Sequence, residues 1–329
     1  RCEVPAEDKL DLVSARAALY GWLFARHAGR QIFLCLTGDR ASPLRATVRD
    51  ELSLLGLEWD QGGEDCPADV SHVFGVPGQA SLRYVPLPPI EGPEAGIRVR
   101  TWIDEGYSGL ALVNCLVRLG WSPRGKRALL TLDELAARFE LERVSRRPVV
   151  FDRRQLDWFN RRWLGGLGAD EVTALLVPHW QAASGRVDRA AGTALSPATW
   201  QQTLGLAIRE ELDRPEQVVG KVRFAFVDEY ALDAASRTVL GEPYAEPILR
   251  AFVHELPTVA PFAFDPLDAG LRELRLRVKT TLGIRSRDVM YVLRAALTGR
   301  QDGPGLVDVC QLLGPARCIR RAQEAILNA

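Results

Sequence analysis

The sequence predicts a small α/β unit followed by a mainly α-helical body. Residues 1–66 alternate short apolar runs with amphipathic stretches, and residues 67–105 are rich in Pro and Gly. Residues 198–329 carry apolar faces with a 3.6-residue period almost throughout. We therefore expect four parts along the chain, at residues 1–66, 67–105, 106–194 and 195–329.

The first part has the β-α-β-α order of half a doubly wound sheet. An amphipathic helix is predicted over 13–27, and the apolar run 32–36 suits a buried parallel strand. A second helix is predicted over 44–55. This order indicates a partial, Rossmann-like half sheet. Residues 67–105 are too few for the other half, so we expect a shortened connection there.

Residues 106–163 carry the densest local signals. A helix is predicted over 110–117, and Thr131 and Glu134 have the spacing of a capping box ahead of a short helix. Asp152 can cap a last helix. The aromatic side chains of that helix have helical spacing, which favours core packing over base stacking: Trp158, Phe159 and Trp163.

The second half of the chain is helical by pattern. Residues 169–177 form a predicted helix that ends in a turn at Pro178. The seam between domains is predicted at 192–197, and a terminal helix is predicted from Pro315. Between them, five segments carry helical apolar faces: 200–212, 215–226, 247–254, 266–282 and 286–296.

Three motif-rich segments resemble one known family. Residues 106–122 are GYSGLALVNCLVRLGWS, residues 139–160 are FELERVSRRPVVFDRRQLDWFN, and residues 293–300 are LRAALTGR. These motifs are similar to those of bacterial-type glutamyl-tRNA synthetases, which are class I aminoacyl-tRNA synthetases. The resemblance implies a helical stem-contact-like domain over 106–194 and a helical anticodon-binding-like domain over 195–329.

The ATP-binding signatures of that family are missing from the corresponding positions. The signature His falls on Asp11, and the signature glycines fall on Val13 and Ser14. The family's Lys-Leu-Ser-Lys-Arg segment falls on residues 89–93, with Pro89 and Gly92 at the lysine positions. Lysines and helix N-termini stabilise phosphates, whereas a carboxylate repels them by about 1 kcal/mol or more. The resemblance therefore implies a truncated, catalytically degenerate relative with no catalytic residues and no cofactor.

Two arginine-rich segments are the candidate RNA contacts. The whole chain has a formal net charge of +0, so RNA must be held by local patches. Seven Arg stand against three acids in 142–162, and eight cations against two acids in 271–300. The alternative is that both are solvated helix faces. The candidate residues are Arg143, Arg146, Arg147, Arg153, Arg154, Arg161, Arg162, Arg272, Arg275, Arg277, Arg285, Arg287, Arg294 and Arg300.

Other classes of site are not indicated. The six Cys are scattered without a C-x-x-C pair and the four His are dispersed, which predicts neither a metal site nor a disulfide framework. No apolar run approaches the roughly 20 residues of a membrane span, so we expect no membrane partner. The chain starts at Arg1 without an initiator Met. Removal of a targeting peptide would produce this start, so we expect a mitochondrial or other organellar matrix, with the cytoplasm as the alternative.

These observations favour a non-catalytic glutamyl-tRNA synthetase-like protein. We expect it to act as an RNA-binding or structural component of a ribonucleoprotein, with tRNA or rRNA and other proteins as partners. A subunit of an organellar ribosome is one concrete form. Two alternatives remain open: a free tRNA-binding factor or regulator, and an enzyme that activates glutamate with a partner supplying the missing half.

Overall fold

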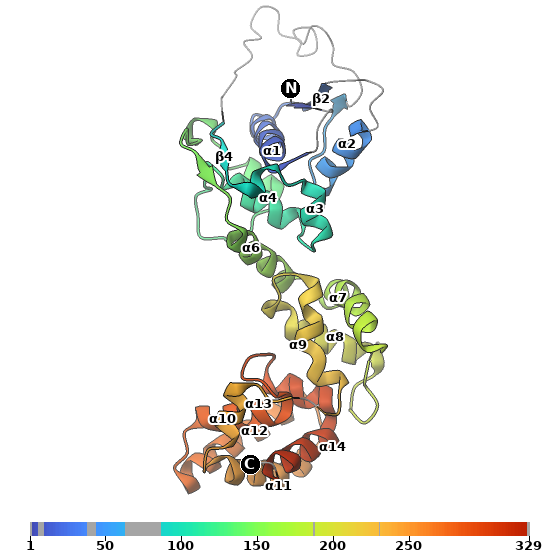
Figure 1. Ribbon diagram of the computed structural model, residues 1–329, viewed down its shortest axis with the longest axis vertical. Coiled ribbons are helices and arrows are strands. Elements are labelled where there is room, and N and C mark those ends of the chain that lie inside the picture. The colour runs from blue at the N-terminus through green and yellow to red at the C-terminus, as the bar shows by residue number, and fades with distance from the viewer. Residues whose placement is uncertain are drawn as a thin grey trace, which may run out of the picture. The chain divides into compact units, whose positions relative to one another are not determined.

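The structure, a computed structural model, describes residues 2–5, 10–37, 44–62, 87–186, 188–229 and 231–327. Most of these residues are helical (Figure 1). The chain divides into two compact units, unit 1 (Arg1–Trp163) and unit 2 (Leu164–Ala329). Much of the Pro- and Gly-rich connection, residues 67–86, lies outside the described residues, and the finer four-part division stays a prediction.

Unit 1 begins with a parallel sheet of three short strands. β1 (Cys2–Pro5), β2 (Phe33–Thr37) and β3 (Gln61–Gly62) lie side by side in that order. The helices α1 (Leu12–His27) and α2 (Leu44–Leu54) connect them (Figure 1). The two predicted helices and the predicted strand of this part are confirmed, each within one residue at either end.

The rest of unit 1 consists of helices and a second parallel sheet of two strands, β4 (Ile90–Glu91) and β5 (Val149–Val150). The capping box is confirmed: Thr131 Oγ1 accepts from Glu134 N at 3.2 Å, and Glu134 Oε2 accepts from Thr131 N at 2.9 Å. The predicted cap is confirmed too, since Asp152 Oδ1 accepts from Arg154 N at 2.9 Å. The elements are β4 (Ile90–Glu91), η2 (Pro93–Gly96), α3 (Val99–Asp104), α4 (Gly109–Val117), α5 (Leu132–Ala136), η3 (Leu141–Arg143), β5 (Val149–Val150) and α6 (Arg153–Gly166).

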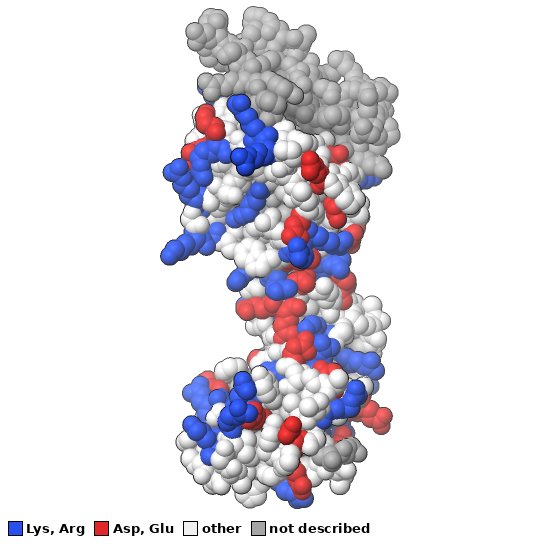
Figure 2. Space-filling view, turned by 60° about the vertical axis from the view of Figure 1, so that its left-hand side comes forward, with Lys and Arg blue, Asp and Glu red and all other residues white. Residues whose placement is uncertain are grey.

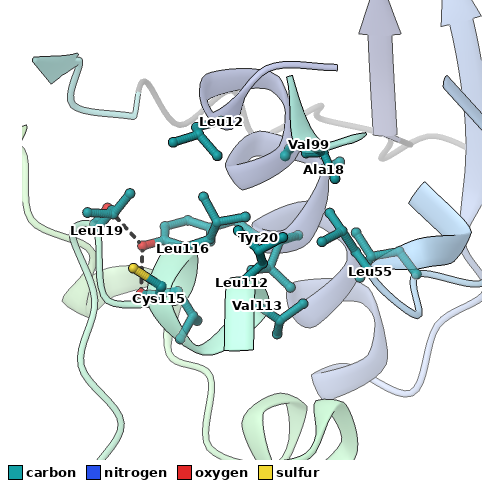
Figure 3. Packing of buried hydrophobic residues seen from close by; sticks show 14 of the residues in the cluster. Leu12, Ala18, Tyr20, Leu55, Val99, Leu112, Val113, Cys115, Leu116 and Leu119 are labelled. Carbon is teal, nitrogen blue, oxygen red and sulfur yellow. Dashed lines mark hydrogen bonds between the residues drawn. The ribbon is translucent and has the colours of Figure 1, made fainter. Parts of the chain in front are cut away.

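The core of unit 1 forms where α1 packs against α4 (Figure 3). Two polar side chains of α1 also hold the end of α4. The Tyr20 hydroxyl donates to Val117 O at 3.0 Å, and burial raises the pKa of this phenol. Arg16, only 1% exposed, donates to Leu119 O at 3.0 Å and to Pro88 O. Carbonyls at a helix C-terminus lack partners inside the helix, so these two side chains satisfy them and fix α1 to the rest of unit 1.

Unit 2 is a bundle of helices. The five segments predicted beyond residue 198 are all helical. A shorter helix, which begins at the cap Asp233, was not predicted. The elements are α7 (Ala169–Ser184), α8 (Pro197–Ile208), η4 (Arg209–Glu211), η5 (Pro215–Gln217), α9 (Val218–Phe226), α10 (Ala234–Leu240), α11 (Ala245–Glu255), η6 (Leu256–Thr258), α12 (Phe264–Leu282), α13 (Ser286–Thr298) and α14 (Leu306–Leu327).

The turn predicted at Pro178 is wrong, because α7 continues through this residue to Ser184. Val172, Leu176 and Trp180 recur at every fourth position and are fully buried. Trp180 packs near Phe226, with ring centroids 6.3 Å apart. Pro178 lies on the exposed side, where its missing N–H has least effect on packing. Tertiary packing of one apolar face has therefore overridden a local helix breaker.

The terminal helix predicted from Pro315 is confirmed: α14 consists of two helices separated by non-helical backbone at Gly314, and the second begins at Pro315. Gly314 has φ 74°, and a Cβ atom there would lie 2.3 Å from Gly192 O, so only glycine fits. Next to the kink, Trp200 Nε1 donates to Leu312 O at 2.9 Å. This contact ties α8 to α14 within unit 2.

None of the described helices has the length and apolar character needed to cross a membrane. Within the described part of the chain, no three His, Cys, Asp or Glu side chains gather in a way that could hold a metal ion.

Candidate nucleic-acid interface

The N-terminus of α1 is capped by the chain's own carboxylate. Asp11, at the position of the signature His, is the N-cap residue, and its Oδ1 accepts from Ser14 N at 2.8 Å. Val13 is 40% exposed and Ser14 is half-buried. Free backbone N–H groups at a helix N-terminus are what a phosphate would bind. Here the Asp11 carboxylate satisfies one of them and brings a negative charge to the same place.

A second segment crosses the start of α1. Arg98 forms an isolated antiparallel bridge with Asp11, and Val99 N donates to Leu10 O at 2.9 Å. The Arg98 guanidinium pairs with Glu51 of α2, Nη2 to Oε1 at 3.0 Å, and Glu51 is 1% exposed. This pair, which sequence reasoning missed because the partners are 47 residues apart, anchors the crossing segment.

The other degenerate signature positions belong to ordered backbone. Pro89 O accepts from Val149 N at 3.1 Å, next to the β4–β5 pairing. Gly92 has φ 109° and is the N-cap of η2, which contacts α1. The structure therefore brings both signature segments to one region of unit 1. From Pro88 to Ile97 that segment contains two glutamates and no Lys or Arg.

Arg153 is part of a cluster that supports α6 rather than a free cation. Its Nε donates to the Tyr107 hydroxyl at 3.2 Å, it pairs with Glu105, and it stacks over Trp102 at 5.2 Å. Tyr107 in turn donates to Asp157 at 2.5 Å. Burial, followed by the bond to Asp157, raises the pKa of Tyr107 to about 12. We conclude that Arg153 contributes mainly to folding.

Four of the other candidate arginines in unit 1 have interaction partners within the chain, but the kind of partner differs. Arg143 pairs with Glu140 at 3.2 Å, and Arg154 pairs with Asp152 at 3.2 Å although its own side chain is 91% exposed. Arg161 is exposed and has a partner within the chain. Arg162 stacks over Trp158 at 5.4 Å.

The remaining two, Arg146 and Arg147, are exposed and have no carboxylate partner among the described residues.

The predicted core packing of the α6 aromatics is only partly right. Phe159 is buried, Trp163 is intermediate, and Trp158 is 39% exposed. Exposed guanidinium groups and one exposed indole therefore remain on unit 1.

Most of the candidate arginines of unit 2 form ion pairs with Asp or Glu side chains. Arg272 pairs with Asp268, and Arg285 pairs with Asp288 at 2.9 Å. Arg287 stacks over the Tyr291 ring at 5.8 Å, and Arg275 is half-buried.

Arg277 bonds Glu273 at 3.0 Å and reaches Glu255 of α11 at 3.3 Å. Asp268 and Glu255 lie outside the 271–300 segment. The local excess of positive charge is therefore smaller in the structure than in the sequence.

The turn after α13 is held by a charge network. Arg300 Nε pairs with Asp302 at 2.8 Å, and Lys221 Nζ reaches the same carboxylate at 2.7 Å. Arg300 first and then Lys221 hold the pKa of Asp302 far below its usual range. Arg294, half-buried, donates to Pro304 O at 2.5 Å, and burial lowers its pKa. Lys221 lies 81 residues before Asp302, so no local pattern signals this network.

Comparisons with known proteins agree with this architecture. The family described as "Anticodon binding domain" matches residues 171–326. The family described as "tRNA synthetases class I (E and Q), catalytic domain" matches residues 97–158, after both degenerate signature segments. The fold and these matches define a class I aminoacyl-tRNA synthetase relative. More particularly, the chain belongs to the glutamyl-tRNA synthetase family.

Individual relatives lead to the same family. The glutamate–tRNA ligase of Geobacillus thermodenitrificans is 30% identical over 228 residues, 69% of this chain and 45% of that protein. The ligase of Heliobacterium modesticaldum is 32% identical over 222 residues, 67% of this chain and 43% of that protein. The chain thus spans about half the length of the curated relatives it matches.

Solved structures share the fold. A glutamate–tRNA ligase from Elizabethkingia meningosepticum, in complex with its amino acid, aligns with a TM-score of 0.68 at 13% identity, over 99% of this chain and 98% of that chain. The glutamate–tRNA synthetase of Elizabethkingia anophelis aligns with a TM-score of 0.72 at 14% identity, over 99% of each chain.

Proposed function

We propose that this chain binds tRNA through unit 2 and does not activate glutamate. The observation that carries the proposal is the N-terminus of α1, where the Asp11 carboxylate occupies the capping position and Arg98 is bridged across it. The anticodon-binding match, over residues 171–326, covers almost all of unit 2. The α/β part of unit 1 is, on this proposal, the remnant of a Rossmann-like nucleotide-binding half.

The physical argument concerns charge at the place where a nucleotide would bind. Triphosphate binding needs free backbone donors and cations that neutralise phosphate oxygens. In this chain a carboxylate stands at the start of α1, and Pro89 and Gly92 stand where the resemblance puts lysines. Replacing two cations by neutral residues and adding an anion disfavours phosphate binding at each of these positions.

The proposal is tested by ATP–pyrophosphate exchange with glutamate, run with and without tRNA beside an active glutamate–tRNA ligase. We expect no exchange above background in either condition. Filter binding should detect binding of tRNA to the chain at low salt, with an affinity that falls as the salt concentration rises. Exchange above background would overturn the non-catalytic part and support the alternative of an enzyme completed by a partner. Absence of any tRNA affinity at low salt would overturn the binding part.

The larger assembly stays a prediction. A ribonucleoprotein subunit and a free tRNA-binding factor both require the same RNA-binding body, and the organellar matrix location is a separate prediction. Gradient fractionation of cell extracts separates them, because a fixed subunit sediments with particles of ribosomal size and a free factor stays near the top. Fractionation of purified organelles then tests the location.

A further inference from the structure

We propose that the groove between α7 and α8 of unit 2 is a docking site for a protein segment that inserts an arginine side chain. The two helices lie side by side (Figure 1), and the groove between them has a volume of about 410 Å³. Residues of α7 form one wall, and residues of α8 form the other. This site is independent of the proposed tRNA binding and takes a different kind of partner.

The wall formed by α7 contains a backbone carbonyl that its own helix leaves without a donor. Pro178 lies inside α7 and has no N–H, so Ala174 O, one turn earlier, lacks the hydrogen bond that the helix would otherwise supply. No side chain of the described residues donates to this oxygen. Ala174 and Pro178 are both exposed and both line the groove. The carbonyl between them can therefore accept a hydrogen bond from a ligand in the groove.

A carboxylate lies one helical turn before that carbonyl. Asp170 is exposed and lines the groove, and its Oδ1 accepts from Gln202 Nε2 at 2.8 Å. This bond from α8 holds the carboxylate in place, and Asp170 Oδ2 has no partner among the described residues. Asp170 and Ala174 are four positions apart on one helix face, so their Cβ atoms lie on the order of 6 Å apart. One ligand group can thus reach both acceptors.

The groove has no cation of its own to balance the carboxylate. Of the described residues that line it, Asp170 alone is charged. Residues 168–185 and 196–208 contain Asp170 and Glu171 but no Lys or Arg. On the face of the molecule shown in Figure 2, acidic and basic side chains lie close together in several places. An acid without a neighbouring cation favours a positively charged ligand and repels a nucleic-acid phosphate.

Arginine is the side chain that matches these acceptors. Its planar guanidinium has several N–H donors in fixed directions, so it can bond the Asp170 carboxylate and the Ala174 carbonyl together. Further along α7, the half-buried Val177 and the exposed Pro178 offer apolar surface to the methylene stem. A lysine ammonium is a compact point charge and matches the two separated acceptors less well.

The open form of the groove favours an arginine carried by a protein over a free small molecule. Ala174, Pro178 and Ala198 line the groove and are exposed, so a free ligand would keep one side in water. A protein segment would cover that side. The two walls are held by close packing, since a Cβ atom at Gly205 would lie 3.2 Å from Val172 Cγ1. A groove that is already formed loses little conformational entropy on binding.

The experiment uses the full chain and a probe of defined chemistry, the pentapeptide acetyl-Ala-Val-Arg-Val-Ala-amide. Its citrulline analogue keeps the shape of the side chain without the charge, and its lysine analogue keeps the charge without the planar group. N-acetylarginine amide represents a free small molecule. Binding is followed by NMR through isotope-labelled glutamines, because Gln201 and Gln202 line the groove.

Two variants each remove one acceptor. Pro178→Ala restores an N–H to the helix, so that Ala174 O bonds within α7, and it should not lower the urea midpoint of unfolding. Asp170→Asn removes the negative charge and keeps an oxygen that can accept from Gln202. Asp265→Asn is the matched control, because it removes an exposed acid of α12 that does not line the groove.

We expect the arginine peptide to shift the Gln201 and Gln202 signals saturably. The two analogues and N-acetylarginine amide should bind more weakly. Pro178→Ala and Asp170→Asn should each weaken binding of the arginine peptide about fivefold, the loss expected for one hydrogen bond, whereas Asp265→Asn should leave it unchanged.

Several results would overturn the site. One is the absence of any saturable shift, and another is equal affinity of the unaltered chain and all three variants. Equal binding of the citrulline peptide rules out a cationic partner, and equal binding of N-acetylarginine amide rules out a protein partner in favour of a free small molecule.

Two other occupants are distinguished by the same signals. Shifts of Gln201 and Gln202 when the chain is concentrated without peptide would mean that a second copy fills the groove. Displacement of the peptide by tRNA, or weaker tRNA binding in Pro178→Ala, would mean that RNA does. Either result replaces the proposed partner, whereas tRNA affinity that is unchanged in Pro178→Ala supports a separate protein-docking site.

Discussion

Each unit contains candidate arginines that carboxylates neutralise and others that they do not. In unit 2, Arg272 and Arg285 pair with carboxylates, whereas Arg287 stacks on a tyrosine ring. In unit 1, Arg153 pairs with Glu105, whereas Arg146 and Arg147 are exposed without a carboxylate partner among the described residues. Surface ion pairs contribute little stability, but they do reduce the potential that a phosphate experiences. The difference teaches that the density of arginine along a chain does not measure the positive surface that the fold presents.

The largest expected effect comes from an arginine that unit 2 has buried completely. Arg321 is 0% exposed and donates to Leu297 O at 2.5 Å and to Phe224 O at 2.8 Å. Arg321→Leu would leave buried carbonyls without donors, at about 1–3 kcal/mol each. We expect a loss of about 3 kcal/mol or more in the free energy of unfolding, measured by urea denaturation.

The neighbouring residue provides the control. Arg320 is 47% exposed in its side chain and pairs with Asp228 at 2.8 Å. Arg320→Leu should cost at most about 1 kcal/mol. Equal losses in the two variants would contradict the view that unit 2 uses buried arginine to hold its backbone.

The next-largest effect tests whether a carboxylate in unit 1 stabilises a helix by accepting a hydrogen bond from its backbone. Asp11→Ala removes the N-cap of α1 and should lower the free energy of unfolding by about 1 kcal/mol, whereas Asp11→Asn should be close to neutral. Neither variant should gain ATP–pyrophosphate exchange, because the lysine positions remain Pro89 and Gly92. Exchange that appears in Asp11→Asn would show that the carboxylate alone blocks the chemistry.

The pH dependence of stability should follow Asp302. Its pKa in the folded chain is lowered, so its contribution is fully present above the ordinary Asp pKa of about 3.9. The contribution is lost as pH falls through the folded pKa. Because its side chain is half exposed, we expect Asp302→Asn to cost only about 0.5–1 kcal/mol at pH 7. The difference in the free energy of unfolding between the unaltered chain and Asp302→Asn should narrow below about pH 4.

A double-mutant cycle with Arg300 checks the origin of that gap. In an Arg300→Ala background the cost of Asp302→Asn should be smaller, because the first of its two cations is gone. A gap that stays constant from neutral to acid pH would show that Asp302 acts through packing and not through charge.

Local signals predicted the elements well, and long-range contacts account for what they missed. The capping box at Thr131 and the cap at Asp152 depend on residues within one turn, so the sequence alone was sufficient. Pro178 misled because the burial of Trp180 depends on residues of another helix. The kink at Gly314 depends on its contact with Gly192, 122 residues earlier. Such contacts leave no periodic pattern.

The candidate site shows the same limit. Counting charges within a segment gave 271–300 a strong excess, because Glu255, Asp268 and Asp302 fall outside the count. The same method cannot find the pair of Arg98 with Glu51, since the two residues lie 47 positions apart in the sequence. Family resemblance located the degenerate positions, but only the structure shows that Asp11 caps α1.

The smallest expected effect is also the most direct test of the difference between paired and unpaired arginines. If pairing is what keeps Arg272 from contributing to RNA binding, Asp268→Asn should release it. We expect tRNA affinity to rise two- to threefold at low salt, with the salt slope steeper by at most about 0.9, the value for one additional phosphate contact. Asp265→Asn removes an exposed acid of the same helix that has no described ion pair, and it changes the net charge equally. If both variants gain the same affinity, net charge alone is responsible. A gain confined to Asp268→Asn means that the acids of unit 2 set how much of its arginine can reach RNA.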